Sequence, residues 1–210
     1  MPYLDRVFVI GPIRPEGEPG YLQKLFAGAG RPIPAALEAW DEQVGAWCAA
    51  YRESTLGANI VETNIDSAVF LFDLTQERVV LAYALSTPAL QKKDTARMRG
   101  FPDVNVGVRA VMGGRAFLAD RGHFLGHASG GVLDINLFPH RRELNRGWTK
   151  GGTYEEGSAF RAMERYVAAH PGVFFYHRPL YDDDTWIPER LEYGYLEDDG
   201  LWRVRTFANK

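Results

Sequence analysis

The spacing of hydrophobic residues near the amino terminus predicts one amphipathic helix, and the segments after it predict paired strands. Within residues 35–51 the apolar side chains recur every three or four positions, which is typical of a helix that buries one face. These residues are Leu37, Trp40, Val44, Trp47, Cys48 and Tyr51. Residues 11–34 are rich in proline and glycine, which predicts a loop. Apolar runs at 68–74 and 79–85, joined by Thr-Gln-Glu-Arg, predict an antiparallel hairpin.

Two further strands are predicted in the middle of the chain. Residues 106–112 and 116–119 are largely apolar and flank Gly113 and Gly114, which suit a turn between strands. Residues 92–100 are polar and basic, so we expect an exposed connection there.

The carboxyl-terminal part predicts a helix followed by three strands. Residues 148–158 predict an irregular insertion, because they are mostly polar or small. Residues 159–170 carry an apolar stripe and are followed by proline and glycine, the pattern of a helix and its stop. Strands are expected at 172–181 and at 190–207, the latter as a hairpin that turns at Asp-Asp-Gly. Together these elements predict the α+β fold class.

One carboxylate falls on the apolar stripe of the predicted helix. Phe160, Met163 and Val167 form the stripe, and Glu164 lies four residues after Phe160. Because burying an uncompensated charge is costly, Glu164 must be paired, contact water on a metal ion, or have an abnormal pKa. The pattern therefore marks Glu164 as a candidate functional residue.

The composition is that of an ordinary globular protein. The 210 residues are 46% hydrophobic and 24% charged, enough for one sizeable core. Cys48 is the single cysteine, which excludes an intrachain disulfide. Nothing in the sequence resembles a signal peptide or a membrane-spanning run. We therefore expect no membrane association, and delivery or secretion by a route that needs no signal peptide.

The charge is distributed unevenly along the chain. A net charge of -3 is unusual for a protein that binds nucleic acid, but residues 100–180 carry ten Lys/Arg against seven Asp/Glu. Residues 181–210 carry four Lys/Arg against eight Asp/Glu. A local basic surplus can neutralise phosphates and make binding salt-dependent, although arginines on an ordinary solvated surface would produce the same pattern.

Three short segments carry side chains suited to phosphodiester hydrolysis. Residues 120–123 are Asp-Arg-Gly-His, residues 136–139 are Asn-Leu-Phe-Pro, and residues 144–147 are Leu-Asn-Arg-Gly. A neutral imidazole can take a proton from attacking water, which makes His123 the candidate general base. An amide oxygen suits Mg²⁺, which prefers oxygen ligands and keeps several waters, so Asn145 is the candidate ligand.

These segments resemble the DNA/RNA non-specific endonucleases of the ββα-metal, or His-Me finger, class. The resemblance implies that His123, in the DRGH motif, is the general base and that Asn145 binds Mg²⁺, for which Mn²⁺ can substitute. The run Arg-Ala-Met-Glu ending at Glu164 resembles the helical motif of that class, which implies that Glu164 holds water on the metal ion. Similarities at residues 178–181 and 187–188 extend the resemblance over residues 60–207.

The resemblance also implies an architecture and a set of supporting roles. It predicts a ββα-metal finger on a central antiparallel sheet flanked by helices, with residues 58–210 as the nuclease domain. Residues 1–57 would be an N-terminal loop and amphipathic helix packed on the core. Arg121 or Arg146 would steady the scissile phosphate. The arginines expected to contact substrate are Arg121, Arg141, Arg142, Arg146 and Arg161, and the expected supporting residues behind the site are Asp120, Asn136 and His127.

The sequence departs from the pattern of that class at three places. His140 stands where many members have glutamine, and Arg178 replaces a glycine before Pro-Leu-Tyr. The segment between Leu-Asn-Arg-Gly and Glu164 is also longer than usual. We expect Arg178 to leave the chemistry intact.

Two other metal sites are weaker interpretations of the same residues. His123 and His127 are four residues apart, as in a zinc-binding helix, but phenylalanine rather than glutamate follows His123. Residues 182–184 are all aspartate and offer carboxylates to a cation, although a charge run in a loop is usually solvated surface.

The expected function is Mg²⁺-dependent hydrolysis of DNA and RNA without sequence specificity, leaving 5′-phosphate ends. The alternative is a catalytically inactive nuclease-like module that binds nucleic acid or a protein. For the biological role, our leading interpretation is a bacterial toxin domain with an inhibitory immunity protein as its partner. The motifs leave open the preference between DNA and RNA and the oligomeric state.

Overall fold

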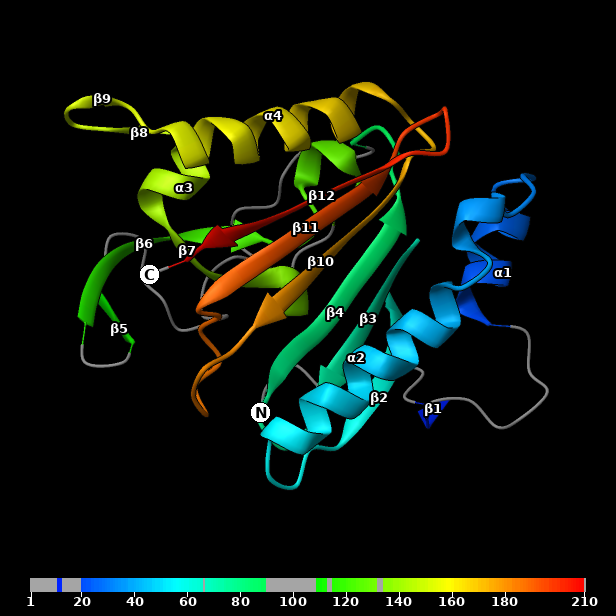
Figure 1. The fold of residues 1–210 in the computed structure, drawn as a ribbon, viewed down its shortest axis with the longest axis horizontal. Coiled ribbons are helices and arrows are strands. Elements are labelled where there is room, and N and C mark those ends of the chain that lie inside the picture. The colour runs from blue at the N-terminus through cyan, green and yellow to red at the C-terminus, as the bar shows by residue number, and fades with distance from the viewer. Residues whose placement is uncertain are drawn as a thin grey trace.

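A seven-stranded antiparallel sheet forms the centre of the computed structural model (Figure 1). Its order is β1-β2-β3-β4-β10-β11-β12. The strands are β1 Gly11–Pro12, β2 Ile60–Ile65, β3 Ala68–Asp73, β4 Arg78–Leu85, β10 Phe174–Leu180, β11 Arg190–Leu196 and β12 Trp202–Ala208. The structure describes residues 11–12, 20–65, 67–89, 109–112, 115–131 and 134–209.

Smaller strands and four α-helices surround this sheet in the described part of the chain. A three-stranded sheet consists of β5 Arg109–Met112, β6 Arg115–His123 and β7 Leu137–Arg141, and a short hairpin consists of β8 Trp148–Thr149 and β9 Gly152–Thr153. The helices are α1 Tyr21–Gly28, α2 Trp40–Ser54, α3 Arg142–Arg146 and α4 Glu155–Ala169. None of the described helices is long and apolar enough to cross a membrane. The predicted α+β class, with a central antiparallel sheet flanked by helices, is confirmed.

The N-terminal helices cover one face of the large sheet (Figure 1). Leu22 and Phe26 of α1 and Trp40 of α2 pack in one core with buried side chains of β3, β4 and β10. Trp40 is 4% exposed and makes ring contacts with Trp47, Tyr83, Phe174, Tyr176 and Trp202. The helices α1 and α2 therefore contribute to the hydrophobic core of the sheet.

The other face of the sheet packs against α4 and the β6–β7 finger (Figure 1). Phe124 and Phe138 of the finger and Phe160 of α4 join this core, and each is at most 2% exposed. With both faces covered, all eight residues of β4 are buried. A strand covered on both faces has a continuous apolar sequence, which is why the hairpin at 68–85 was predictable.

Several predicted elements have different limits in the structure. Part of the predicted loop at 11–34 is the helix α1, because Leu22, Leu25 and Phe26 are spaced to bury one side. The helix predicted at 35–51 is a 3₁₀ turn, Ala35–Leu37, followed by α2. The predicted insertion at 148–158 contains the β8–β9 hairpin and the first turn of α4, and β2 was not predicted.

Some predictions fall outside the described residues. They concern the exposed connection at 92–100, the turn at Gly113 and Gly114, and parts of the N-terminal loop. The strands on either side of that turn, β5 and β6, pair as expected, from Arg109 opposite Leu118 to Met112 opposite Arg115.

Replacing Trp40 with alanine tests whether the N-terminal helices belong to the core. Because Trp40 is buried among five rings, we expect the free energy of unfolding to fall by about 3–5 kcal/mol. Urea denaturation measures this change. Leu56→Ala is the control, since Leu56 is 94% exposed. A loss below about 1 kcal/mol for Trp40→Ala, within the range of surface substitutions, would show that the helix does not stabilise the sheet.

Candidate active site

His123 ends strand β6, and the loop after it is fixed by Asn136. His123 pairs with Leu137 of β7 in the antiparallel register. The Asn136 side chain is fully buried, and its Oδ1 accepts a hydrogen bond from the Leu125 amide while its Nδ2 donates to the Leu125 carbonyl, both at 2.8 Å. The Phe124 amide donates to the Asn136 carbonyl at 2.9 Å. These three bonds hold the backbone directly after His123.

The glycine of the Asp-Arg-Gly-His segment allows β6 and β7 to pack closely. A Cβ at Gly122 would overlap the Cβ of His140. His140 itself is 1% exposed. The small residue one position before His123 is therefore required by packing.

Asn145 lies on α3, a helix of only five residues. Isolated helices of this length are not stable in water, so tertiary contacts must hold α3. Leu144 is fully buried in the core, and Gly147 ends the helix with φ +77°, in the left-handed region that favours glycine. Asn145 remains partly exposed beside Leu144.

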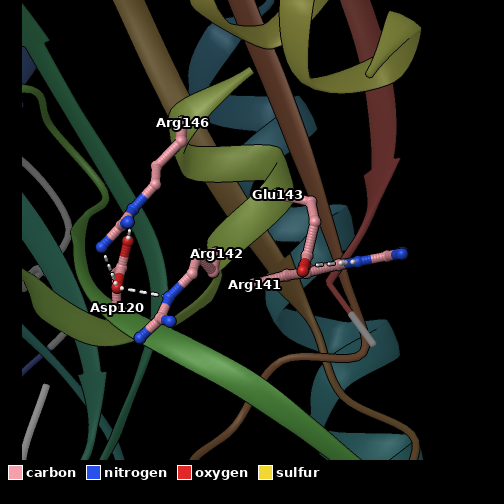
Figure 2. Close-up of polar contacts among 5 residues, drawn as sticks. All are labelled: Asp120, Arg141, Arg142, Glu143 and Arg146. Atoms are coloured by element: carbon pink, nitrogen blue, oxygen red, sulfur yellow. Dashed lines mark hydrogen bonds and ion pairs between the residues drawn. The ribbon is translucent and has the colours of Figure 1, made fainter. Parts of the chain in front are cut away.

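Asp120 anchors α3 to strand β6 (Figure 2). Its carboxylate accepts hydrogen bonds from Arg146 Nε at 2.6 Å, Arg146 Nη2 at 3.0 Å and Arg142 Nε at 3.1 Å. The Asp120 side chain is 8% exposed, whereas those of Arg142 and Arg146 are 26% and 38% exposed, so the carboxylate is buried and its partners reach the surface. The two arginines flank Asn145 on α3, and Asp120 lies three residues before His123 on β6. One buried carboxylate therefore links the strand that carries His123 to the helix that carries Asn145.

A close contact at two glycines fixes α3 against α4. A Cβ at Gly157 would overlap the carbonyl oxygen of Glu143 and lie 2.9 Å from the Cα of Gly147. The Gly147 carbonyl accepts hydrogen bonds from the Tyr154 amide at 3.2 Å and from Ser158 Oγ at 3.3 Å. The end of α3 and the start of α4 thus form one packed unit.

Glu164 lies on the inner side of α4, beside the loop that follows His123. A Cβ at Gly126 would lie 3.7 Å from Glu164 Oε1. The Glu164 side chain is 23% exposed and forms an ion pair with Arg161 Nη1 at 3.4 Å. Burial raises the pKa of Glu164 to about 7, and the nearby Arg161 only partly offsets this effect. Glu164 is thus both paired and shifted in pKa, two of the outcomes expected for a carboxylate on the apolar stripe, and its contact with water on a metal ion stays a prediction.

Two buried histidines to which the sequence analysis gave no role in the site lie beside it. His140 and His177 are each 1% exposed, and both pack on the Phe160 ring, with centroid distances of 4.9 and 5.8 Å. Burial lowers the pKa of His177 to about 3, and burial together with His177 and His123 lowers the pKa of His140 well below its usual value. Both rings are therefore neutral at pH 7.

The arginines predicted to contact substrate do not form a single cluster. Arg142 and Arg146 meet at Asp120, whereas Arg141 pairs with Glu143 at 3.4 Å on the other side of α3 (Figure 2). Arg161 pairs with Glu164. Arg121 lies on β6 opposite Pro139 and is partly buried, and His127 begins a 3₁₀ turn after Gly126. Contact of these residues with substrate remains a prediction.

The donor set fits a metal ion that keeps most of its own waters. No group of three or more His, Cys, Asp or Glu suited to a metal occurs among the described residues. The partly exposed amide of Asn145 offers an oxygen donor, and a divalent cation near Glu164 would favour the charged carboxylate and so oppose the effect of burial on its pKa. Mg²⁺ suits such a site because it prefers oxygen and binds few protein groups.

The run of aspartates at 182–184 is used within its own loop. Asp183 Oδ1 accepts hydrogen bonds from the amide and the hydroxyl of Thr185, at 2.9 and 2.6 Å. Asp182 lies 3.7 Å from Arg190 Nη2. Arg78 Nη1 donates to the backbone carbonyls of Asp183 and Thr185. These contacts indicate a structural role for the run.

Comparison with known proteins finds similarity to nucleases among solved structures. No protein-family model and no curated protein matches the chain. The chain is similar to a Sda1 nuclease with bound zinc ion, with 15% identity and a TM-score of 0.47 over 77% of this chain and 80% of that one. It is also similar to an extracellular nuclease, with 15% identity and a TM-score of 0.40 over 74% and 88% of the two chains. An EndoG/EndoGI complex gives 14% identity and a TM-score of 0.39, over 71% and 74%.

The raised pKa of Glu164 predicts a pH-dependent stability in metal-free protein. An acid whose folded pKa is raised stabilises the fold in its protonated form, so this contribution is present below pH 4.5 and is lost as the pH rises through about 7. Glu164→Gln keeps the shape of the side chain without titrating. The variant should therefore gain stability relative to wild type between about pH 5 and about pH 8. Urea denaturation in EDTA measures both proteins, and a difference that stays constant over this range would contradict the assignment.

Proposed function

We propose that this chain is a divalent-cation-dependent nuclease that hydrolyses phosphodiester bonds of DNA and RNA. The observation that carries the proposal is the arrangement around His123. Three residues before it, Asp120 holds the arginines on either side of Asn145. Three residues after it, Gly126 lies beside the Glu164 carboxyl. The segments on either side of the candidate base thus contact α3, which carries the candidate ligand Asn145, and α4, which carries the Glu164 carboxyl.

His123 acts as the general base in the proposed mechanism. A neutral imidazole takes the proton of a water molecule as that water attacks phosphorus from the side opposite the leaving oxygen. The fixed backbone at Phe124 and Leu125 limits the movement of the His123 ring during this step. Departure of the 3′-oxygen then leaves a 5′-phosphate end.

The remaining residues bind and orient the phosphate and the attacking water. Asn145 would hold Mg²⁺ or Mn²⁺, which supplies positive charge where negative charge develops on the phosphate oxygens. Glu164 accepts hydrogen bonds from water in the site and so orients it. Arg146, whose plane is fixed by Asp120, and Arg121 steady the scissile phosphate through their remaining N–H groups. Contacts to phosphate and sugar read no bases, so we expect low sequence selectivity.

Digestion of plasmid DNA and of RNA tests the proposed activity. Purified protein with Mg²⁺ should degrade both substrates, and EDTA should stop the reaction because the positive charge at Asn145 is removed. Intact plasmid and RNA after incubation with Mg²⁺ and with Mn²⁺ would favour an inactive nuclease-like module instead.

Replacement of His123 with alanine tests the general-base assignment. Loss of the base should lower turnover by about 10²- to 10⁴-fold while leaving DNA binding and Mn²⁺ binding close to wild type. Turnover is measured with a fluorescent oligonucleotide, and binding is measured in parallel. An equal loss of binding and turnover would assign His123 to substrate or metal binding.

We further propose a toxin role, with an inhibitory protein as partner, because a nuclease without sequence selectivity would damage the nucleic acid of any cell that holds it uninhibited. Expression in a bacterial cytosol, with His123→Ala as the matched control, tests this role. Toxicity of the wild-type chain alone supports it. Equal growth of both strains would exclude killing by the proposed chemistry.

A further inference from the structure

Asn209, directly after β12, is buried and makes hydrogen bonds to two separate parts of the chain. It is 0% exposed. Its side-chain Nδ2 donates to the carbonyls of Pro139 at 3.0 Å and Pro188 at 2.9 Å, and its Oδ1 accepts from the Arg141 amide at 2.8 Å. Its own amide donates to the Glu189 carbonyl at 2.8 Å.

The partners of Asn209 lie at the points where the candidate site joins the large sheet. Pro139 belongs to β7, and Arg141 is the residue from which α3 starts. The neighbouring Ala208 amide donates to Glu156 Oε1, in the first turn of α4, at 2.8 Å. The end of β12 therefore contacts both the start of α3 and the start of α4.

We propose that Asn209 is a positioning residue that sets α3, and with it Asn145, relative to the sheet. Asp120 holds α3 from β6 through the side chains of Arg142 and Arg146, and the packing of Gly147 on Gly157 holds the end of the helix against α4. Asn209 adds a different contact, because it binds the backbone of Arg141 and Pro139 and so fixes the point at which the chain passes from β7 into α3. This inference deepens the proposed nuclease function and rests on the role given there to Asn145.

The hydrogen bonds around Asn209 require an amide of this length. Two carbonyl oxygens face its Nδ2 and one N–H faces its Oδ1, so the group must donate on one side and accept on the other. Aspartate has the same shape but would place an oxygen against the carbonyls of Pro139 and Pro188. Glutamine would add a methylene to a fully buried position. Asn209→Asp therefore removes the anchor with the smallest change in volume.

The experiment compares wild type, Asn209→Asp and Asn64→Asp. Asn64 is exposed on β2, so it controls for the same chemical change away from the site. For Asn209→Asp we expect faster amide hydrogen exchange at residues 139–147, with exchange in β3 and β4 unchanged. We also expect roughly tenfold weaker Mn²⁺ binding by electron paramagnetic resonance, and kcat about a hundredfold lower with KM little changed, because small displacements of a catalytic group have effects of this size.

The outcomes separate positioning from stability and from the proposed function. The proposal would be overturned if folded Asn209→Asp exchanged amide hydrogens at residues 139–147 as slowly as wild type. It would also be overturned if the variant kept the Mn²⁺ affinity and kcat of wild type. An increase of exchange in β3 and β4 equal to that at residues 139–147 would also overturn the proposal, since it would show general destabilisation of the fold. If Asn209→Asp does not fold, the same measurements on Asn209→Ala test whether Asn209 positions α3. If wild type cleaves nothing, the proposed function fails, while the exchange data still decide whether Asn209 holds α3.

Discussion

The buried carboxylate of Asp120 is the contact on which the candidate site depends most. It binds two arginines on a helix too short to be stable alone, and it lies on the same strand as the candidate base. A buried ion pair often adds little net stability, because the cost of removing charges from water offsets their attraction. Removing one partner is different, since it leaves the other charge uncompensated. Asp120 therefore matters for geometry more than for net stability, because it links the helix that carries Asn145 to the strand that carries His123.

The site also contains groups that are unfavourable for stability. Glu164 is held where burial raises its pKa to about 7, and His140 and His177 are buried imidazoles whose pKa values burial lowers. The two kinds of group change the stability of the fold in opposite directions with pH. The carboxyl destabilises the fold as the pH rises, and the histidines destabilise it as the pH falls below about 6.5. Such groups are expected at sites where chemistry, and not stability, determines the residues.

The sequence predicted the parts of the molecule that depend on local pattern. The hairpin of β3 and β4, the strand leading to His123 and the stripe of α4 all follow from hydrophobic spacing, and so did the inward position of Glu164. The helix α1 was missed because the prolines and glycines around it hid three apolar positions, Leu22, Leu25 and Phe26. The start of α4 was placed too late because Gly157 looks like a loop residue, whereas the close approach of α3 requires it. Asn209 carried no signal, since all its partners are distant in sequence.

A double-mutant cycle between Asp120 and Asn145 tests most directly whether the buried carboxylate acts through the candidate metal ligand. In wild type, Asp120→Asn should lower kcat for oligonucleotide cleavage about a hundredfold, because Asn145 is displaced. In the Asn145→Ala background the same replacement should lower kcat by less than about threefold, since the effects of two residues are not additive when one acts through the other. An equal loss in both backgrounds would show that Asp120 and Asn145 act independently and would contradict this account.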